Sequence, residues 1–112
     1  TLKTFLSAYY QKEVESRVNP FYFPFTEPSF EFSLSCPFCD KMGCKICSQV
    51  GWIELLGCGM VHPNVLEMAG IDSKKYSGFA FGCGVERLIM MKFGIEDVRL
   101  FHSAKLKFLK QF

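Results

Sequence analysis

The sequence predicts an α+β fold in which helices flank an antiparallel sheet. Short runs that alternate apolar and polar residues, typical of half-buried strands, recur between residues 18 and 82. Apolar residues at three- and four-residue spacing, typical of helices, lie near the start and after residue 84. The 112 residues, 49% hydrophobic and 21% charged, suit one globular domain with one core.

The N-terminal part predicts a helix followed by an extended segment. Residues 1–15 place five apolar side chains on one helical face: Leu2, Phe5, Leu6, Tyr9 and Tyr10. Thr1 is a candidate N-cap for this helix. Residues 18–25 are expected to be extended, because Pro20 and Pro24 exclude a helix there.

The middle of the chain predicts a hairpin with a cysteine-rich tip and then a short helix. Residues 31–35 and 51–57 predict its two strands, and residues 36–47 form the tip between them. Pro63 suits the first turn of a helix through Met68, and the glycine two residues further on ends it.

The last third predicts a strand and helical segments. Residues 76–82 predict a strand, and residues 85–93 a helix that ends at Gly94 and turns three side chains inward: Leu88, Ile89 and Met91. We expect a helical turn at residues 97–101 and a closing segment at residues 106–112. We expect no internal repeat.

Charge and hydropathy exclude two classes of function. A net charge of +2 argues against a generic nucleic-acid surface. No apolar run is long enough to cross a bilayer and no signal peptide is recognisable, so we expect a cytoplasmic protein without a membrane partner. Thirteen phenylalanines are many for this length and indicate an aromatic pocket or surface buried against another chain or segment.

Two CxxC pairs, separated by four residues, indicate a metal site. The favoured reading is one structural zinc ion held by four thiolates on a hairpin tip, as in zinc ribbons, without a role in catalysis. Reduced free thiols are the second reading, and disulfides the third. The candidate ligands are Cys36, Cys39, Cys44 and Cys47, whereas Cys58 and Cys83 are expected to be small buried residues.

The segment from Gly78 to Arg87 predicts a site for an anionic ligand such as a triphosphate. Gly82 and Gly84 let a ligand approach the backbone, and Arg87 supplies a cation at the start of a helix. The alternative reading of Arg87 is a surface residue paired with Glu86.

Several motifs resemble one enzyme family. Residues 82–87 (GCGVER) resemble the third motif of class II aminoacyl-tRNA synthetases. Four further segments are similar to the alpha-subunit family of bacterial phenylalanyl-tRNA synthetases: residues 23–29, 56–65, 76–82 and the ending with Arg99-Leu-Phe and residues 108–112. The resemblance implies a class II synthetase-like antiparallel sheet with flanking helices. It also implies ATP-dependent conversion of phenylalanine to phenylalanyl-adenylate, transfer to tRNA(Phe), and an assembly of two alpha and two beta subunits.

The resemblance also implies that this catalytic domain is incomplete. Alpha subunits of the family are much longer, and their second motif supplies the group that binds the α-phosphate of ATP. The sequence has three arginines, and Arg17 is expected in a connector, away from that position. Residues 1–112 are therefore read as the C-terminal part of the class II catalytic domain, with a four-cysteine insertion, and as inactive alone.

The resemblance assigns nucleotide and metal roles to four residues. Arg87 would bind the γ-phosphate of ATP, with Gly84 and Glu86 beside it in the nucleotide site. Glu27 would bind Mg²⁺, since a hard carboxylate suits that ion; its alternative reading is a solvated turn residue. His62 is expected to cap a helix or pack in the core, without a catalytic role.

The resemblance assigns the phenylalanine pocket to four further residues. The rings of Phe23 and Phe25 are expected on the same side of the backbone, where they would hold the substrate ring; ordinary core aromatics are the alternative. Ala80 and Gly82 would leave room for that ring. A zinc-ribbon module that binds RNA or protein without catalysis is the competing function, followed by an inactive paralogue or an engineered fragment.

Overall fold

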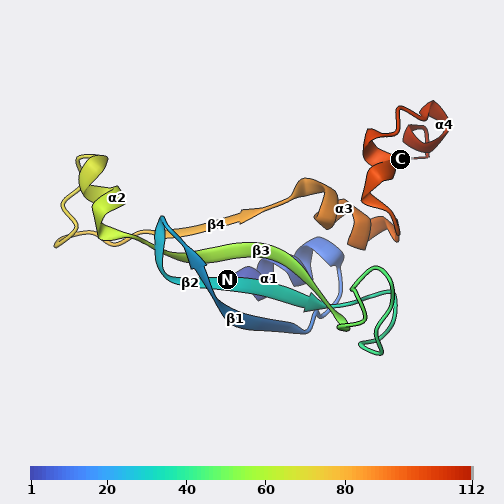
Figure 1. Cartoon of the computed structure of the whole chain (residues 1–112), viewed down its shortest axis with the longest axis horizontal. Helices are drawn as coiled ribbons and strands as arrows, with labels where there is room; N and C mark the ends of the chain where they lie inside the picture. The colour runs from blue at the N-terminus through green and yellow to red at the C-terminus, as the bar shows by residue number, and fades with distance from the viewer. Residues whose placement is uncertain (112) are drawn as a thin grey trace.

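A four-stranded antiparallel sheet, with strands in the order β1-β2-β3-β4, organises the fold (Figure 1). The structure, a computed structural model, describes residues 1–111. Its elements in chain order are α1 (Leu2–Tyr10), β1 (Ser16–Phe23), β2 (Thr26–Ser35), β3 (Trp52–Val61), α2 (Pro63–Met68), β4 (Phe79–Cys83), α3 (Val85–Phe93), the 3-10 helix η1 (Val98–His102) and α4 (Leu106–Leu109). The predicted α+β class, with helices around an antiparallel sheet, is confirmed.

The molecule is elongated, with principal extents of 51 × 32 × 25 Å. Its radius of gyration is 16.9 Å, whereas a compact domain of this length has about 13 Å. Strands and helices therefore leave much of their surface without cover from the described residues, and many large apolar side chains are exposed.

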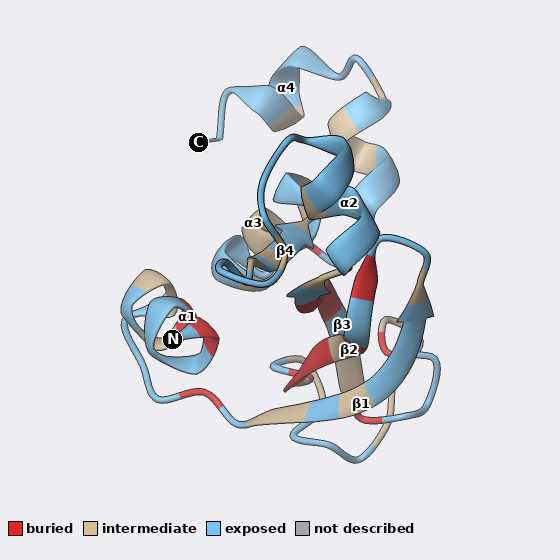
Figure 2. Ribbon diagram, turned by 90° about the vertical axis from the view of Figure 1, so that its left-hand side faces the viewer, coloured by how far each residue is buried: buried red, intermediate tan, exposed pale blue. Residues whose placement is uncertain are grey.

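One face of the sheet carries the core. Buried leucines of α1, Leu2 and Leu6, pack with Phe32 and Leu34 of β2 and Leu56 of β3. Figure 2 shows the buried segments on α1 and on β2 and β3. Leu88 and Met91 of α3, both half-buried, pack against the same cluster; Ile89, predicted to face inward with them, is equally half-buried but does not pack against it. Helix α1 and one side of α3 thus cover this face; the other side of α3 borders the opposite, free face of the sheet, where Arg87 and Met90 line a cavity.

Strand pairing aligns small and polar residues in rows on the free face. Arg17 pairs with Ser33, which pairs with Glu54 on β3. Two further rows cross to β4, where Gly57 pairs with Gly82 and Gly59 with Ala80. Since paired residues present their side chains to the same face, this register gives the sheet a charged end and a glycine-lined end.

The first helix is shorter than predicted. It ends at Tyr10 because Gln11 adopts a left-handed conformation (φ 55°), and the amides of Gln11 and Lys12 bond back to the helix carbonyls. Thr1 makes no side-chain capping bond. The apolar positions up to Tyr10 predicted the helix correctly, but residues 12–15 continue as a connector, where Val14 is buried against the core.

Strands β2 and β3 are longer than predicted, whereas β4 begins at Phe79 and is shorter than the predicted strand at residues 76–82; two expectations about β1 also need correction. Residues 18–25 are not one extended segment: Phe23 pairs with Thr26, so Pro24 and Phe25 form the tight turn between β1 and β2. Arg17 lies within β1 and not in a connector. By contrast, α2 and α3 have the predicted bounds, and Gly94 caps α3 in the left-handed conformation.

The C-terminal part is a short helical extension. The 3-10 helix η1 overlaps the predicted turn at residues 97–101, and α4 occupies part of the predicted closing segment, whose last residue lies outside the described residues. Among residues 1–111, none of the helices has the length and apolar character that crossing a membrane requires.

Candidate functional site

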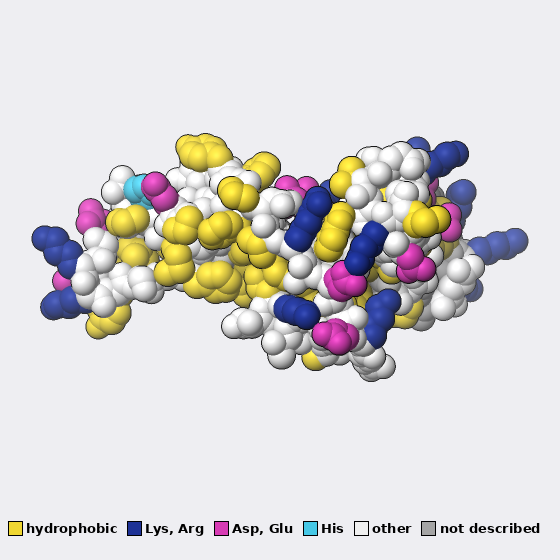
Figure 3. Space-filling view, turned by 90° about the horizontal axis from the view of Figure 1, so that it is seen from below, with side chains coloured by type: hydrophobic (Ala, Val, Ile, Leu, Met, Phe, Trp, Pro, Cys, Tyr) yellow, Lys and Arg dark blue, Asp and Glu magenta, His cyan; other side chains and the backbone are white. Residues whose placement is uncertain are grey.

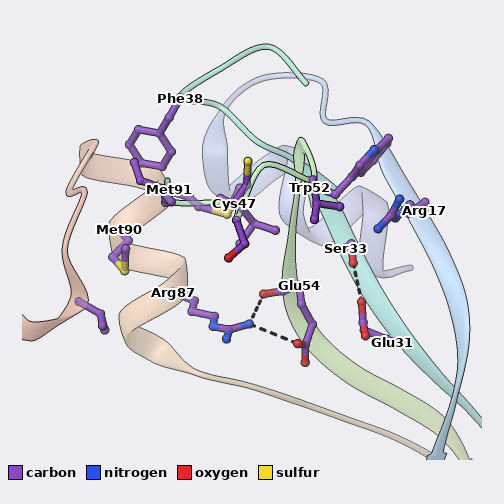
Figure 4. Close-up of a pocket in the computed structure, with 15 residues that line it drawn as sticks. Arg17, Glu31, Ser33, Phe38, Cys47, Trp52, Glu54, Arg87, Met90 and Met91 are labelled. Atoms are coloured by element: carbon purple, nitrogen blue, oxygen red, sulfur yellow. Dashed lines mark hydrogen bonds and ion pairs between the residues drawn. The ribbon is translucent and has the colours of Figure 1, made fainter. Parts of the chain in front are cut away.

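The two ends of the free sheet face each carry a cavity. The larger, of about 470 Å³, lies between the sheet, α3 and the cysteine-rich segment. Arg87, in the first turn of α3, extends into it toward β3 (Figure 4). Its Nη1 donates to the backbone carbonyl of Glu54 and lies 3.7 Å from the Glu54 carboxylate. Both side chains are about half exposed, so water screens this pair and a stronger anion can displace the carboxylate.

Arg17 brings a second guanidinium to this cavity. Its Cζ lies 5.0 Å from the centre of the Trp52 ring, a cation–π contact that holds it above β3. Its Nε is buried and has no hydrogen-bond partner among the described residues. Glu31 and Glu54 line the same space, so the cavity pairs two cations with two carboxylates.

Sequence reasoning missed Arg17 and Glu54 as cavity residues. Arg17 was expected in a connector, because the two prolines that follow hid the start of β1 at Ser16. Glu54 is the polar residue inside an otherwise apolar strand, and strict alternation along β3 would place it on the core face with Leu56. The pairing instead shifts at Leu55, from Phe32 with Leu56 to Ser33 with Glu54, and this extra residue turns Glu54 to the free face. The local signal is a charged residue inside an apolar strand; its position on the free face follows from the pairing with β2.

The smaller cavity, of about 330 Å³, is apolar and contains all four residues expected to bind phenylalanine. The rings of Phe23 and Phe25 stack 5.6 Å apart with an interplanar angle of 19°. Ala80 and Gly82 of β4 line the space beside them. Glu54 lines this cavity as well as the Arg87 cavity, so the two spaces adjoin at one carboxylate.

Glycines shape the floor of the apolar cavity. A Cβ on Gly57 would lie 2.6 Å from Cζ of Phe23, so the ring lies directly over this glycine and fixes one wall. A Cβ on Gly82 would meet no atom within 4 Å. The space over Gly82 is therefore open to a ligand of the size of an aromatic ring.

Glu27 and His62 lie together in a third hollow, of about 440 Å³, near the β1–β2 turn. His62 caps α2, as one expectation had it: its Nδ1 accepts from the Asn64 N–H at 3.2 Å. Its Nε2 lies 3.4 Å from the Glu27 carboxylate, whose side chain is 76% exposed. Glu27 is thus an accessible hard oxygen ligand, held beside the helix start.

Gly84 and Glu86 lie outside the three cavities so far described. Gly84 precedes α3, and its carbonyl accepts from the Leu88 N–H. Glu86 does not pair with Arg87; its carboxylate lies 4.0 Å from His102 Nε2. The partner of Arg87 is instead Glu54 on β3, 33 residues earlier in the sequence.

Four cysteines gather at the tip between β2 and β3. Their sulfur atoms all lie within 4.8 Å of one another, and none is in a disulfide. Burial raises the pKa of Cys36 to about 12, whereas N–H groups of Cys44 and Gly51 outweigh the burial of Cys47 and lower its pKa to about 6. Cys58 is buried as expected, and Cys83 is half-buried.

The antiparallel sheet with its flanking helices is the core of a class II synthetase domain, as comparison with known families shows. The family model for the tRNA synthetases class II core domain (F) matches residues 1–112, and the chain belongs to this family. It is 57% identical over 112 residues to the phenylalanine–tRNA ligase alpha subunit of Leptospira biflexa serovar Patoc and 54% identical over 112 residues to that of Pseudomonas fluorescens. It is 55% identical over 111 residues to that of Francisella tularensis subsp. tularensis.

These matches cover 99–100% of the chain but 33% of each relative, so the chain spans about a third of their length. The predicted resemblance to a bacterial phenylalanyl-tRNA synthetase alpha subunit is confirmed at the level of the family and of the named relatives.

Proposed function

We propose that this chain is the C-terminal part of the catalytic domain of a phenylalanine–tRNA ligase alpha subunit. The complete enzyme would convert phenylalanine and ATP to phenylalanyl-adenylate and pyrophosphate, and then transfer the aminoacyl group to tRNA(Phe). One observation carries the proposal: an aromatic-lined cavity of ring size adjoins an arginine-lined cavity at Glu54. A bound phenylalanine with its ring in the first would extend its polar end toward ATP phosphates in the second.

The chemistry needs positioning and charge neutralisation more than acid–base groups. A carboxylate oxygen of phenylalanine forms a bond to the α-phosphorus as the bond to the leaving pyrophosphate breaks. Arg87 would hold the γ-phosphate after exchanging its solvent-screened contact with Glu54 for a charge-assisted one. The group that binds the α-phosphate is expected from a part of the enzyme beyond these residues, so the chain alone is expected to be inactive.

The pocket walls suit phenylalanine. Phe23 and Phe25 would contact one side of the ring, and each well-placed aromatic pair contributes about 0.5–1.5 kcal/mol beyond burial. Ala80 and Gly82 would face the other side, with Ala80 limiting substituents at the para position. Gly84 and Glu86 lie beside the nucleotide cavity and are proposed to shape it through the start of α3.

Two metal ions are proposed for the complete enzyme. Mg²⁺ is proposed as a cofactor with ATP and Glu27 as a protein ligand of Mg²⁺, because a hard carboxylate suits that ion. The hollow that contains Glu27 shares none of its described lining residues with the Arg87 cavity, so Glu27 would bind its ion apart from the γ-phosphate. A structural Zn²⁺ would bind Cys36, Cys39, Cys44 and Cys47, since four soft sulfur ligands already lie close together there. The roles proposed above for the side chains stay the same when both ions are bound.

A beta subunit and the rest of the alpha subunit are the proposed macromolecular partners, together with tRNA(Phe), in the two-alpha, two-beta assembly typical of the family. Figure 3 shows hydrophobic side chains gathered across the middle of one face of the molecule, with most charged side chains to either side. Several strand and turn aromatics are exposed: Phe21, Tyr22, Phe25, Phe79 and Phe81. Such surface needs cover from protein or substrate. The cytoplasm, which keeps thiols reduced, is the proposed location.

Amino-acid-dependent exchange of pyrophosphate into ATP tests this function. The full-length alpha subunit, purified with its beta subunit, should exchange pyrophosphate with phenylalanine and not with leucine. Arg87→Ala in the same assembly should abolish most of the exchange. An assembly that shows no exchange with phenylalanine, or the same exchange after Arg87→Ala, would contradict the proposal.

A further inference from the structure

The cysteine-rich segment is a tandem repeat, which corrects the expectation that the chain has none. Residues 36–43 (CPFCDKMG) and 44–51 (CKICSQVG) share the pattern C-x-x-C-x-x-apolar-Gly, without a gap between the copies. The cysteine spacing alone does not reveal the repeat; the apolar residue and the glycine at the seventh and eighth positions of each copy do.

The two copies adopt the same backbone path. In each, the two residues after the second cysteine are left-handed: Asp40 and Lys41 have φ of 44° and 69°, and Ser48 and Gln49 have 53° and 64°. The next amide in each copy bonds back to the carbonyl of that cysteine, at 2.8 Å in the first copy and 3.1 Å in the second. The left-handed conformation raises the free energy of each of these four non-glycine residues, so contacts within the module must stabilise both turns.

The copies also pack on each other reciprocally. A Cβ on Gly43 would lie 2.8 Å from the Gln49 carbonyl oxygen, and one on Gly51 would lie 2.4 Å from that of Lys41. Gln49 and Lys41 occupy equivalent positions in the repeat. Each glycine therefore lets the other copy approach, and the pair forms a two-fold arrangement around the sulfur atoms.

The sulfur atoms lie where one tetrahedral ion would need them. Ligands at ~2.3 Å from zinc form a tetrahedron whose edges are about 3.8 Å. Equivalent cysteines lie 3.8 Å apart (Cys36 and Cys44) and 3.7 Å apart (Cys39 and Cys47), and Cys44 lies 3.6 Å from Cys47. The amides of Cys44 and Gly51 donate to the Cys47 sulfur, each at 3.2 Å, and would stabilise a bound thiolate.

This module forms a wall of the Arg87 cavity. Phe38 of the first copy and Cys47 of the second line the cavity, opposite the sheet and next to Met91 of α3 (Figure 4). Lys41 places its Nζ 5.8 Å from the centre of the Trp52 ring, the same ring that holds Arg17. Both copies thus line the space beside Arg87, and the first copy also reaches the Trp52 ring that holds Arg17.

We propose that one zinc ion, bound by the four thiolates of this repeat, holds the module against α3 and β3 and thereby sets the affinity of the Arg87 cavity for a nucleotide. This inference rests on the proposed function of that cavity. Zinc with four thiolates carries two net negative charges, so it would repel a triphosphate. The module must therefore act through the shape of the wall, as a positioning element without contact to the reacting atoms.

The apolar cavity supplies an internal control. None of the residues described as lining it belongs to the repeat. Loss of zinc should therefore raise the Kd for ATP by about two- to thirtyfold, the range for positioning effects away from the ligand, and leave the affinity for phenylalanine unchanged. Loss of zinc should also lower the protection of backbone amides from hydrogen exchange, in residues 36–51 and beyond them in Trp52 and in the part of α3 beside the module.

The experiment uses the full-length alpha–beta enzyme, loaded and after chelation. Elemental analysis should find one zinc per alpha subunit, and cobalt substitution should give the absorption bands of a tetrahedral thiolate site. Calorimetry measures ATP and phenylalanine binding separately, and hydrogen exchange measures protection of residues 52–54 and 87–91. Cys39→Ser should lose zinc and weaken ATP binding; Cys83→Ser, a cysteine outside the repeat, should do neither. Phe38→Ala should keep zinc and still weaken ATP binding.

Each result decides a separate point. Disulfides or an absence of zinc in anaerobically purified enzyme would overturn the site. Zinc that can be removed without a change in ATP affinity or in exchange at residues 52–54 and 87–91 would overturn the coupling. If ATP does not bind the loaded enzyme, the proposed function fails, and hydrogen exchange alone then decides whether zinc orders the cavity wall.

Discussion

Gly82→Ala separates a ligand-binding role from a structural one. Gly82 lies on β4 opposite Gly57, at the open side of the apolar cavity. A Cβ added here meets no atom within 4 Å, so the folded protein has room for it. If a phenylalanine ring occupies this space, the added methyl group instead competes with the substrate.

The expected size follows from the cost of overpacking. The cavity measures about 330 Å³, and a methyl group in a filled site typically costs about 1–3 kcal/mol. At about 1.4 kcal/mol for each factor of ten, the KM for phenylalanine should rise roughly five- to hundredfold. Thermal stability and the KM for ATP should stay close to those of the parent.

Pyrophosphate exchange by the full-length assembly, with thermal unfolding of the same samples, measures both quantities. Gly59→Ala is the matched control: its Cβ would lie 2.4 Å from the carbonyl oxygen of Pro28, which is backbone and cannot turn aside. This variant should lower the melting temperature. An unchanged KM for phenylalanine in Gly82→Ala, or a fall in its melting temperature like that of Gly59→Ala, would refute the reasoning.

Three further predictions concern other residues. Arg87→Lys should lower kcat/KM for ATP by about ten- to a thousandfold, because lysine cannot make the paired contacts of a guanidinium. The KM for phenylalanine should change little. Pyrophosphate-exchange kinetics measure both values, and a kcat/KM for ATP like that of the parent would count against a phosphate role for Arg87. Ala80→Gly should admit para-chlorophenylalanine, and aminoacylation without any gain over the parent would exclude Ala80 as the limit. Hydrogen bonds from the Arg99 side chain and N–H lower the pKa of Asp97 from 3.8 to about 2. The stability that this contact adds should therefore be present above pH 3.8 and vanish as the pH falls through about 2. An NMR titration of Asp97 with a midpoint near 3.8 would contradict this prediction.

Local signals predicted the helices that end in glycine. Pro63 at the first turn and Gly70 beyond the end gave α2 its bounds, and Gly94 did the same for α3. The end of α1 could not be predicted, because no glycine or proline marks it. Gln11 turns the chain in the left-handed conformation, and the connector that follows brings Val14 into the core, a tertiary contact that no local pattern announces.

Pairing between strands also lies beyond local signals. The pairing of Phe23 with Thr26 and of Arg17 with Ser33 depends on the register between β1 and β2. The turn between these strands sets that register, and its Pro24 suggested an extended segment instead of a turn. Motif resemblance identified the aromatic pocket residues, and the structure brings them into one cavity. It did not identify Glu54, which becomes visible only when β3 pairs with β2 and β4 and its carboxylate faces both cavities.

The position of a bound intermediate tests the central claim most directly. A crystal structure of the full-length alpha–beta enzyme with a non-hydrolysable phenylalanyl-adenylate analogue would show it. The account predicts the phenyl ring between Phe23, Phe25 and Ala80, and the link to the nucleotide beside Glu54, with the Arg87 cavity continuing from it. A ring bound elsewhere, or a nucleotide outside the Arg87 cavity, would contradict it.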